Sequence, residues 1–176
     1  KRKTGGDAEN WRALGDKYRK ENKYDEAVKA YRKAVELDSG DDHSYYWLGR
    51  IYYHNKMDSD AEKSFKNALL ANPRLADAHY RLGIIQYQAE RFGDALKHFN
   101  KAIELQPHFP KAYYSRGLSY YKMHDREKAI RDLKTTIAQD PSYFRAYYNL
   151  GDIYQNSKNY EMALQYFSKD NELRPK

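Results

Sequence analysis

The sequence predicts an all-α protein built from five consecutive helical hairpins. A glycine, an alanine and a large aromatic or aliphatic residue each recur with a period of 34 residues. The glycines are Gly15, Gly49, Gly83, Gly117 and Gly151. An alanine follows twelve residues after each of them, and Tyr31, Phe65, Phe99, Leu133 and Phe167 follow four residues later. A fixed period of this length is the sequence signature of a repeat array.

Each period contains two stretches with helical apolar spacing. In the second period, Tyr45, Leu48 and Tyr52 follow three- and four-residue steps, and Ala61 and Phe65 do so in the second stretch. Polar turns separate the stretches, and Pro73, Pro107, Pro141 and Pro175 end four of the five periods. The expected helices span residues 8–21, 25–38, 42–55, 59–72, 76–89, 93–106, 110–123, 127–140, 144–157 and 161–174.

A glycine inside a helix costs about 1 kcal/mol relative to alanine, so its repetition indicates close packing at that point. We expect the alanine twelve residues later to be the surface that faces each glycine. The large residue four positions further on would fill the space beside it.

The second period resembles the tetratricopeptide repeat (TPR) signature, through Tyr45, Leu48-Gly49, Tyr52, Ala61 and Phe65. The resemblance covers residues 8–175 and implies a right-handed superhelical solenoid of five antiparallel helix-turn-helix repeats. It also implies that the first helices line a concave groove. Four residues depart from the family's preferences: Gln86 replaces Tyr, Arg116 replaces Leu, and Thr136 and Asp170 replace Ala.

The expected boundaries follow from the repeat. Residues 1–7 are expected to form a tail and residues 8–175 a single domain, with repeats at 8–41, 42–75, 76–109, 110–143 and 144–175. Asp170 and Asn171 stand where the third repeat has Ala102 and Ile103. Because the end of such a stack needs a polar outer face, Asp170 is expected there with nothing stacked on it.

Composition and motifs favour a binding protein. The chain has no cysteine, which excludes disulfides and thiolate metal sites, and no apolar run long enough to cross a membrane. Phosphate-loop, nucleophile-elbow, dinucleotide and paired-histidine zinc motifs are missing from the sequence. We therefore expect a soluble cytoplasmic or nuclear protein that is not an enzyme, needs no cofactor and binds no metal.

The resemblance places six positions of each repeat on the concave side of the groove. They are rich in tyrosine, whose large ring and hydroxyl suit peptide binding, although each ring could instead pack on a neighbouring repeat. The candidate ligand-binding residues are Tyr46, Trp47, Arg50, Tyr53, Tyr80, Arg81, Tyr87, Lys111, Tyr114, Tyr121, Lys122, Arg145, Tyr148 and Asn149. Arg12, Arg19 and Lys20 occupy further concave positions, so the groove is also predicted to be basic.

The net charge of +7 and the basic groove favour an acidic partner. The leading hypothesis is a protein-interaction scaffold that binds a peptide segment, acidic by preference, because Arg and Lys donate charge-assisted hydrogen bonds to carboxylates. One alternative is single-stranded RNA binding, with tyrosines stacking on bases. Another is a designed or truncated repeat array without a ligand of its own. Self-association through the ends of the stack is also expected to be feasible, and membrane insertion is not expected.

Overall fold

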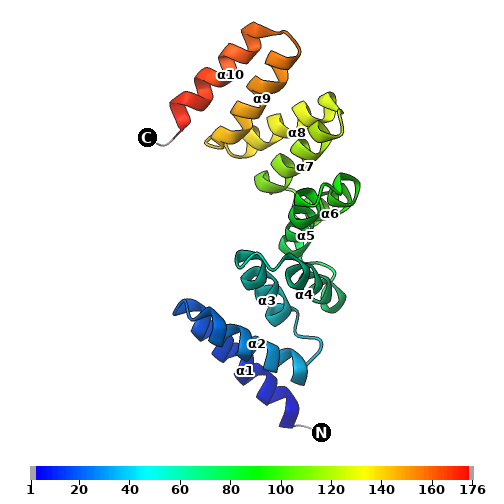
Figure 1. Cartoon of the computed structure of the whole chain (residues 1–176), viewed down its shortest axis with the longest axis vertical. Coiled ribbons are helices and arrows are strands. Elements are labelled where there is room, and N and C mark those ends of the chain that lie inside the picture. Colours follow the sequence, from blue (N-terminus) through cyan, green and yellow to red (C-terminus); the bar gives the residue numbers. More distant parts are fainter. Residues whose placement is uncertain (1–2, 175–176) are drawn as a thin grey trace. The chain divides into compact units, whose positions relative to one another are not determined.

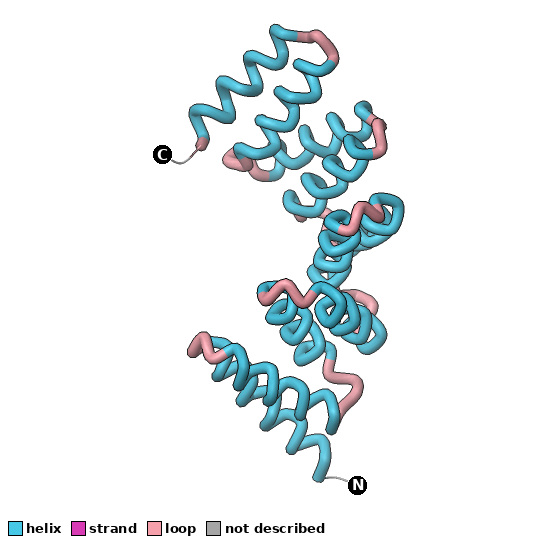
Figure 2. The backbone as a smooth tube through the Cα atoms, in the orientation of Figure 1, coloured by secondary structure: helices cyan, strands magenta, loops and turns pink. Residues whose placement is uncertain are grey.

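The computed structural model describes residues 3–174 of the chain and the side chains of residues 6–174. Lys1, Arg2 and Pro175 therefore lie outside the described residues. All regular structure within residues 3–174 is helical (Figure 2), which confirms the predicted all-α helical-repeat architecture. The described helices, labelled in Figure 1, are α1 (Lys3–Lys20), α2 (Tyr24–Leu37), α3 (Asp42–His54), α4 (Asp58–Ala71), α5 (Ala76–Gln88), α6 (Phe92–Leu105), α7 (Pro110–Lys122), α8 (Arg126–Gln139), α9 (Phe144–Asn156) and α10 (Tyr160–Leu173).

The helix boundaries agree with the sequence prediction to within one residue, except at the start of α1. That helix begins at Lys3, although the sequence placed its start at residue 8 and assigned residues 1–7 to a tail. The extra turn contains Gly5-Gly6 and lacks apolar periodicity. Neither feature signals a helix, so sequence periodicity could not reveal it.

The turn inside each hairpin holds one non-glycine residue in the left-handed backbone region. These residues are Asn22, Lys56, Glu90, His124 and Lys158, each with φ close to +60°. In the second hairpin, the Lys56 amide donates to the Tyr53 carbonyl at 3.1 Å and the Met57 amide donates to the Tyr52 carbonyl at 2.9 Å. This Schellman arrangement satisfies the last carbonyls of the first helix and reverses the chain within a few residues.

The second helix of each hairpin provides much of the core. In α4, Ala61, Phe65 and Ala68 lie on one face at helical spacing and are fully buried. The small alanines allow the neighbouring helices to approach, and the phenyl ring fills the space between them. The equivalent residues of α2, α6 and α8 are buried in the same way.

The repeated glycines face the large residue sixteen positions later, and not primarily the alanine as the sequence suggested. A Cβ added at Gly49 would lie 2.8 Å from the ring of Phe65. A Cβ added at Gly15 would lie 2.6 Å from the ring of Tyr31, and a Cβ added at Gly151 would lie 2.6 Å from the ring of Phe167. In the fourth hairpin the alanine contributes as well, because a Cβ at Gly117 would lie 3.3 Å from the carbonyl oxygen of Ala129. The ring therefore needs the room that a missing side chain provides.

The structure divides into two compact units, Lys1–Ile85 and Gln86–Lys176. In the N-terminal unit, Ala61 and Phe65 of α4 form a cluster with Ala78, Leu82 and Ile85 of α5. In the C-terminal unit, α8 and α9 form a buried cluster that consists of Ala129, Leu133, Ala146, Leu150 and Ile153. None of the helices within residues 3–174 is long and apolar enough to span a bilayer.

Candidate functional site

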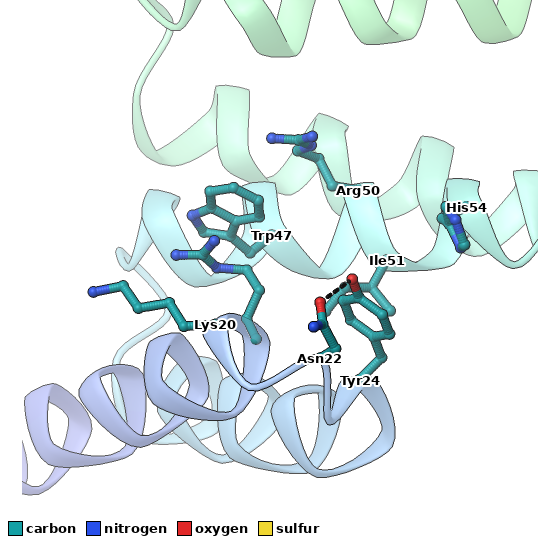
Figure 3. A pocket seen from close by; sticks show the side chains of 8 residues that line it. Lys20, Asn22, Tyr24, Trp47, Arg50, Ile51 and His54 are labelled. Carbon is teal, nitrogen blue, oxygen red and sulfur yellow. Dashed lines mark hydrogen bonds between the residues drawn. The ribbon is translucent and has the colours of Figure 1, made fainter.

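The N-terminal unit contains a pocket of about 360 Å³ at the end of its first helices, named here the N-terminal pocket. Side chains from α1, from the turn that follows it, from the start of α2 and from α3 form its walls (Figure 3). The lining residues are Arg19, Lys20, Asn22, Tyr24, Trp47, Arg50, Ile51 and His54. Two of them, Trp47 and Arg50, were predicted as ligand-binding residues.

Trp47 stacks with two guanidinium groups in this pocket. The Cζ of Arg19, from α1, lies 3.7 Å from the centroid of the indole, and the Cζ of Arg50 lies 4.6 Å from it. Tyr46 contacts the same indole edge-on, with ring centroids 5.5 Å apart. Cation–π contacts of this kind hold long arginine side chains in place, so the pocket has a defined wall.

Arg19 is fixed by a hydrogen-bonded cluster behind the pocket. The hydroxyl of Tyr31 donates to the Asp16 carboxylate at 2.7 Å, and Arg19 contacts the same oxygen at 3.3 Å and donates to the Tyr31 hydroxyl at 3.2 Å. His43 Nε2 lies 3.0 Å from Asp16. Burial alone would raise the pKa of Asp16, but the bonds from His43, Tyr31 and Arg19 outweigh burial and lower it. Asp16 is thus held as a carboxylate that neutralises Arg19.

Four other predicted residues of the N-terminal unit lie outside the N-terminal pocket. Tyr46 packs on Phe65, with ring centroids 5.9 Å apart, and Tyr53 packs against the core cluster of α4 and α5. Arg81 lies over the ring of Tyr80 at 5.7 Å, and its Nε is buried without a hydrogen-bond partner. Tyr46 and Tyr53 therefore pack on core residues, which is the alternative role that the sequence left open for each tyrosine.

The C-terminal unit contains a larger pocket of about 700 Å³, named here the C-terminal pocket. Its lining residues come from α7, α9 and the end of α10: Tyr114, Phe144, Arg145, Tyr148, Asn149, Asp170 and Arg174. Four of these, Tyr114, Arg145, Tyr148 and Asn149, were predicted from their repeat positions. The Asn149 amide donates to the Tyr114 hydroxyl at 3.1 Å, which links α9 to α7. Tyr148 is 48% exposed, so its ring is available to a ligand.

Asp170 corrects one expectation. The sequence placed it on a polar outer face, but it is only 5% exposed and lies in the wall of the C-terminal pocket. Its Oδ2 accepts a hydrogen bond from Arg174, and its Oδ1 is buried without a partner. A buried carboxylate is stable only when it is paired, so Arg174 one turn later compensates for the loss of the family's alanine.

The remaining predicted residues lie apart from both pockets. The Tyr121 hydroxyl donates to Asp152 and accepts from Asn156, both at 2.9 Å; burial first, and then the bond to Asp152, raises the pKa of Tyr121. Lys122 and Tyr121 together line a separate pocket of about 410 Å³. Tyr87 packs edge-on against Phe92, and burial raises the pKa of Tyr87. Lys111 is exposed on α7.

Several pocket residues were not among the predicted set, for identifiable reasons. Asn22 belongs to the first hairpin turn, Tyr24 begins the second helix α2, and Asp170 and Arg174 belong to the last second helix or its end. The repeat positions used for prediction lie only on first helices. Among the described residues, no group of three His, Asp or Glu side chains is arranged to hold a metal ion.

Comparisons with known proteins point to one family. Models described as TPR repeat or tetratricopeptide repeat match residues 15–56, 42–75, 76–109 and 114–171. A crystal structure of MamA is 31% identical, covers 91% of this chain and 94% of its own, and gives a TM-score of 0.85. A second crystal structure of MamA is 30% identical over 96% of this chain and 92% of its own, with a TM-score of 0.87.

A third solved structure is that of YrrB, described as a TPR protein with an unusual peptide-binding site. It is 28% identical, covers 96% of this chain and 87% of its own, and gives a TM-score of 0.84. A search of curated protein sequences found no match.

Proposed function

Because the chain belongs to the tetratricopeptide repeat family, we propose that it is a protein-interaction scaffold whose first helices bind a peptide segment, acidic by preference. The observation that carries the proposal is the C-terminal pocket. Four side chains chosen from repeat position alone come together there from α7 and α9. Peptide sites in proteins combine exposed aromatic surface with a few placed polar groups, and Tyr148 and Asn149 supply both.

Charge supports the preference for an acidic peptide. Arg145 lines the C-terminal pocket, and Lys20 and Arg50 line the N-terminal pocket. Arginine binds carboxylates through two parallel N–H donors, which gives orientation as well as attraction. YrrB is described by its peptide-binding site, and the likeness of this chain to YrrB is consistent with the same general use.

The proposal includes no catalytic activity, because the sequence lacks the motifs that position nucleophiles, phosphates or metals. It also includes a cytoplasmic or nuclear location and self-association through the ends of the stack. Light scattering at several protein concentrations tests self-association directly.

The binding surface is tested with two variants matched within the C-terminal unit. Tyr148→Ala removes an exposed ring from a first helix, and Leu164→Ala removes an exposed apolar side chain from a second helix. Each variant and the unaltered chain are used as bait in the same lysate, after melting curves establish that all three are folded.

Proteins that bind through the first helices are expected to be lost from the Tyr148→Ala bait and retained on the Leu164→Ala bait. Identical sets of proteins on all three baits, together with unchanged binding of an acidic degenerate peptide library, would refute the assignment of the surface. Retention of RNA, weakening steeply with salt, would favour the nucleic-acid alternative instead.

A further inference from the structure

The N-terminal pocket has an unbalanced charge. Arg19, Lys20 and Arg50 line it together with His54, and no carboxylate is among its lining residues. Figure 3 shows Arg50 and His54 projecting from α3, and Lys20 extending from the end of α1 toward the side away from them. The C-terminal pocket differs in this respect, because Asp170 forms part of its wall.

Only one of the three permanent cations is neutralised within the protein. Arg19 contacts Asp16 at 3.3 Å and the Tyr31 hydroxyl at 3.2 Å. Lys20 and Arg50 form no ion pair with any carboxylate in the part of the chain that the structure describes. Two unpaired positive charges therefore face the same pocket of about 360 Å³.

Arg50 is oriented to receive an anion. Its guanidinium lies against the indole of Trp47, with Cζ 4.6 Å from the ring centroid. Such a contact leaves the edge of the guanidinium free, and all five N–H donors of arginine lie in that edge. A group with two or more acceptor oxygens can then accept a forked pair of hydrogen bonds.

The charge of the pocket discriminates between acidic ligands. A carboxylate carries one negative charge and would leave one of the two cations unpaired. A phosphorylated side chain carries about −1.5 to −2 charges near neutral pH and has three strong acceptor oxygens. The phosphoryl group therefore matches Lys20 and Arg50 together, while Tyr24 and Trp47 provide apolar surface for the adjoining peptide.

We propose that the N-terminal pocket is a recognition site for a phosphorylated side chain in a peptide partner. This inference rests on the proposed function, since it names the chemistry that one part of the peptide-binding surface prefers. Arg50 binds the phosphoryl oxygens through its forked donors, Lys20 adds positive charge at the wall of the pocket, and Asp16 keeps Arg19 in place as the second stacking partner of Trp47.

Trp47 provides a direct measurement, because the chain contains only two tryptophans. The indole N–H resonance of Trp47 reports on the pocket, and that of Trp11, in α1 and outside the pocket, serves as the internal reference. The probes are three degenerate peptide libraries that differ only in a fixed central residue, which is phosphoserine, serine or glutamate. Inorganic phosphate alone is the fourth probe.

The phosphoserine library is expected to shift the Trp47 resonance at concentrations about tenfold or more below those needed for the glutamate library, because the doubly charged phosphoryl group gains more from the forked donors of Arg50 and from the charge of Lys20. Equal responses to phosphoserine and glutamate would overturn the preference for a phosphoryl group. Inorganic phosphate is expected to bind more weakly than the library, and equal affinity would show that the peptide is not part of the ligand.

Variants assign the effect to the pocket. Arg50→Gln removes the charge and the forked donors and should abolish the preference for phosphoserine, whereas Arg50→Lys keeps the charge and should retain part of it. Arg74→Gln, which removes an exposed guanidinium of the N-terminal unit that lines neither pocket, is the matched control and should leave the Trp47 titration unchanged. Preserved phosphoserine preference in a folded Arg50→Gln variant would refute the site.

The outcome is separable from that of the bait experiment. Loss of partners from the Tyr148→Ala bait with no phosphoserine preference would leave the scaffold function standing and remove only this inference. A phosphoserine preference together with identical partners on all baits would support the N-terminal pocket and refute the proposed C-terminal surface.

Discussion

The guanidinium of Arg116 donates two hydrogen bonds to the carboxylate of Asp132, from Nε at 2.7 Å and from Nη2 at 2.8 Å. Arg116 lies on α7 and Asp132 on α8, and their side chains are 17% and 2% exposed. The other four repeats have leucine where Arg116 stands: Leu14, Leu48, Leu82 and Leu150. A buried ion pair thus occupies a core position that is apolar elsewhere in the array.

The first prediction is that Arg116 and Asp132 are strongly coupled. Arg116→Leu leaves the Asp132 carboxylate buried without a partner and is expected to cost about 3–5 kcal/mol of unfolding free energy. Asp132→Ala should cost less, because the more exposed Arg116 can turn toward water. The double variant should be more stable than Arg116→Leu, since a well-packed apolar pair can replace a buried ion pair without loss.

Denaturant titration of the four proteins measures this coupling. Alanine is a suitable partner for the new leucine, because Ala30 is buried at the equivalent position of the first repeat. Additive effects of the two single substitutions would show that the ion pair does not hold these helices together.

The second prediction concerns the contact between Gly49 and Phe65. Gly49→Ala should lower the unfolding free energy by about 1–2 kcal/mol, because overpacking against the buried ring outweighs the gain in helix propensity. The added methyl would lie 2.8 Å from the ring. In a Phe65→Leu background the same change should cost less, since a Cβ at Gly117 lies 3.4 Å from Leu133 in the fourth hairpin.

Gly93→Ala is the control for helix propensity in this series, because a Cβ there would meet nothing within 4 Å. It should be neutral or slightly stabilising in the same thermal melts. If Gly49→Ala behaves as Gly93→Ala does, the glycine is not required by the ring of Phe65.

Periodicity predicted the fold because each hairpin repeats one packing solution. Ala61, Phe65 and Ala68 can be read as a buried helix face without a structure, and so can their equivalents in other repeats. The start of α1 at Lys3 could not be read in this way, because the sequence Lys3-Thr4-Gly5-Gly6 contains no large apolar residue that could form a pattern.

The candidate site was only partly predictable. Repeat position identified Tyr114, Arg145, Tyr148 and Asn149, which the C-terminal pocket brings together. It did not identify Asn22, whose role in the N-terminal pocket depends on a left-handed turn. Nor could it separate tyrosines that pack, such as Tyr46 on Phe65, from those that remain exposed, because the same side chain suits both environments.

The third prediction is an acid-dependent contribution from Asp16. Its pKa is lowered in the folded protein, because hydrogen bonds from His43, Tyr31 and Arg19 outweigh the opposing effect of burial. The stabilisation is therefore fully present above the unfolded-state value of about 3.9 and is lost as the pH falls through the lower folded-state value.

Melting temperatures of the unaltered chain and of Asp16→Asn measure this contribution. The variant should melt at a lower temperature at pH 7, and the difference should shrink as the pH falls below about 4 toward the lowered folded-state pKa of Asp16. A difference that stays constant over this range would contradict the assigned role of the Asp16 carboxylate.

The fourth prediction concerns the left-handed residue of the hairpin turns. Lys56 has φ of 59°, a conformation that costs a residue with a Cβ about 1–2 kcal/mol and costs glycine little. Lys56→Gly should therefore stabilise the protein by about 0.5–1 kcal/mol, after allowance for the greater freedom of glycine in the unfolded chain. Lys63→Gly, on the exposed face of α4, is the matched control and should destabilise by about 1 kcal/mol. Denaturant midpoints that move in the same direction for both variants would show that turn geometry does not limit stability at Lys56.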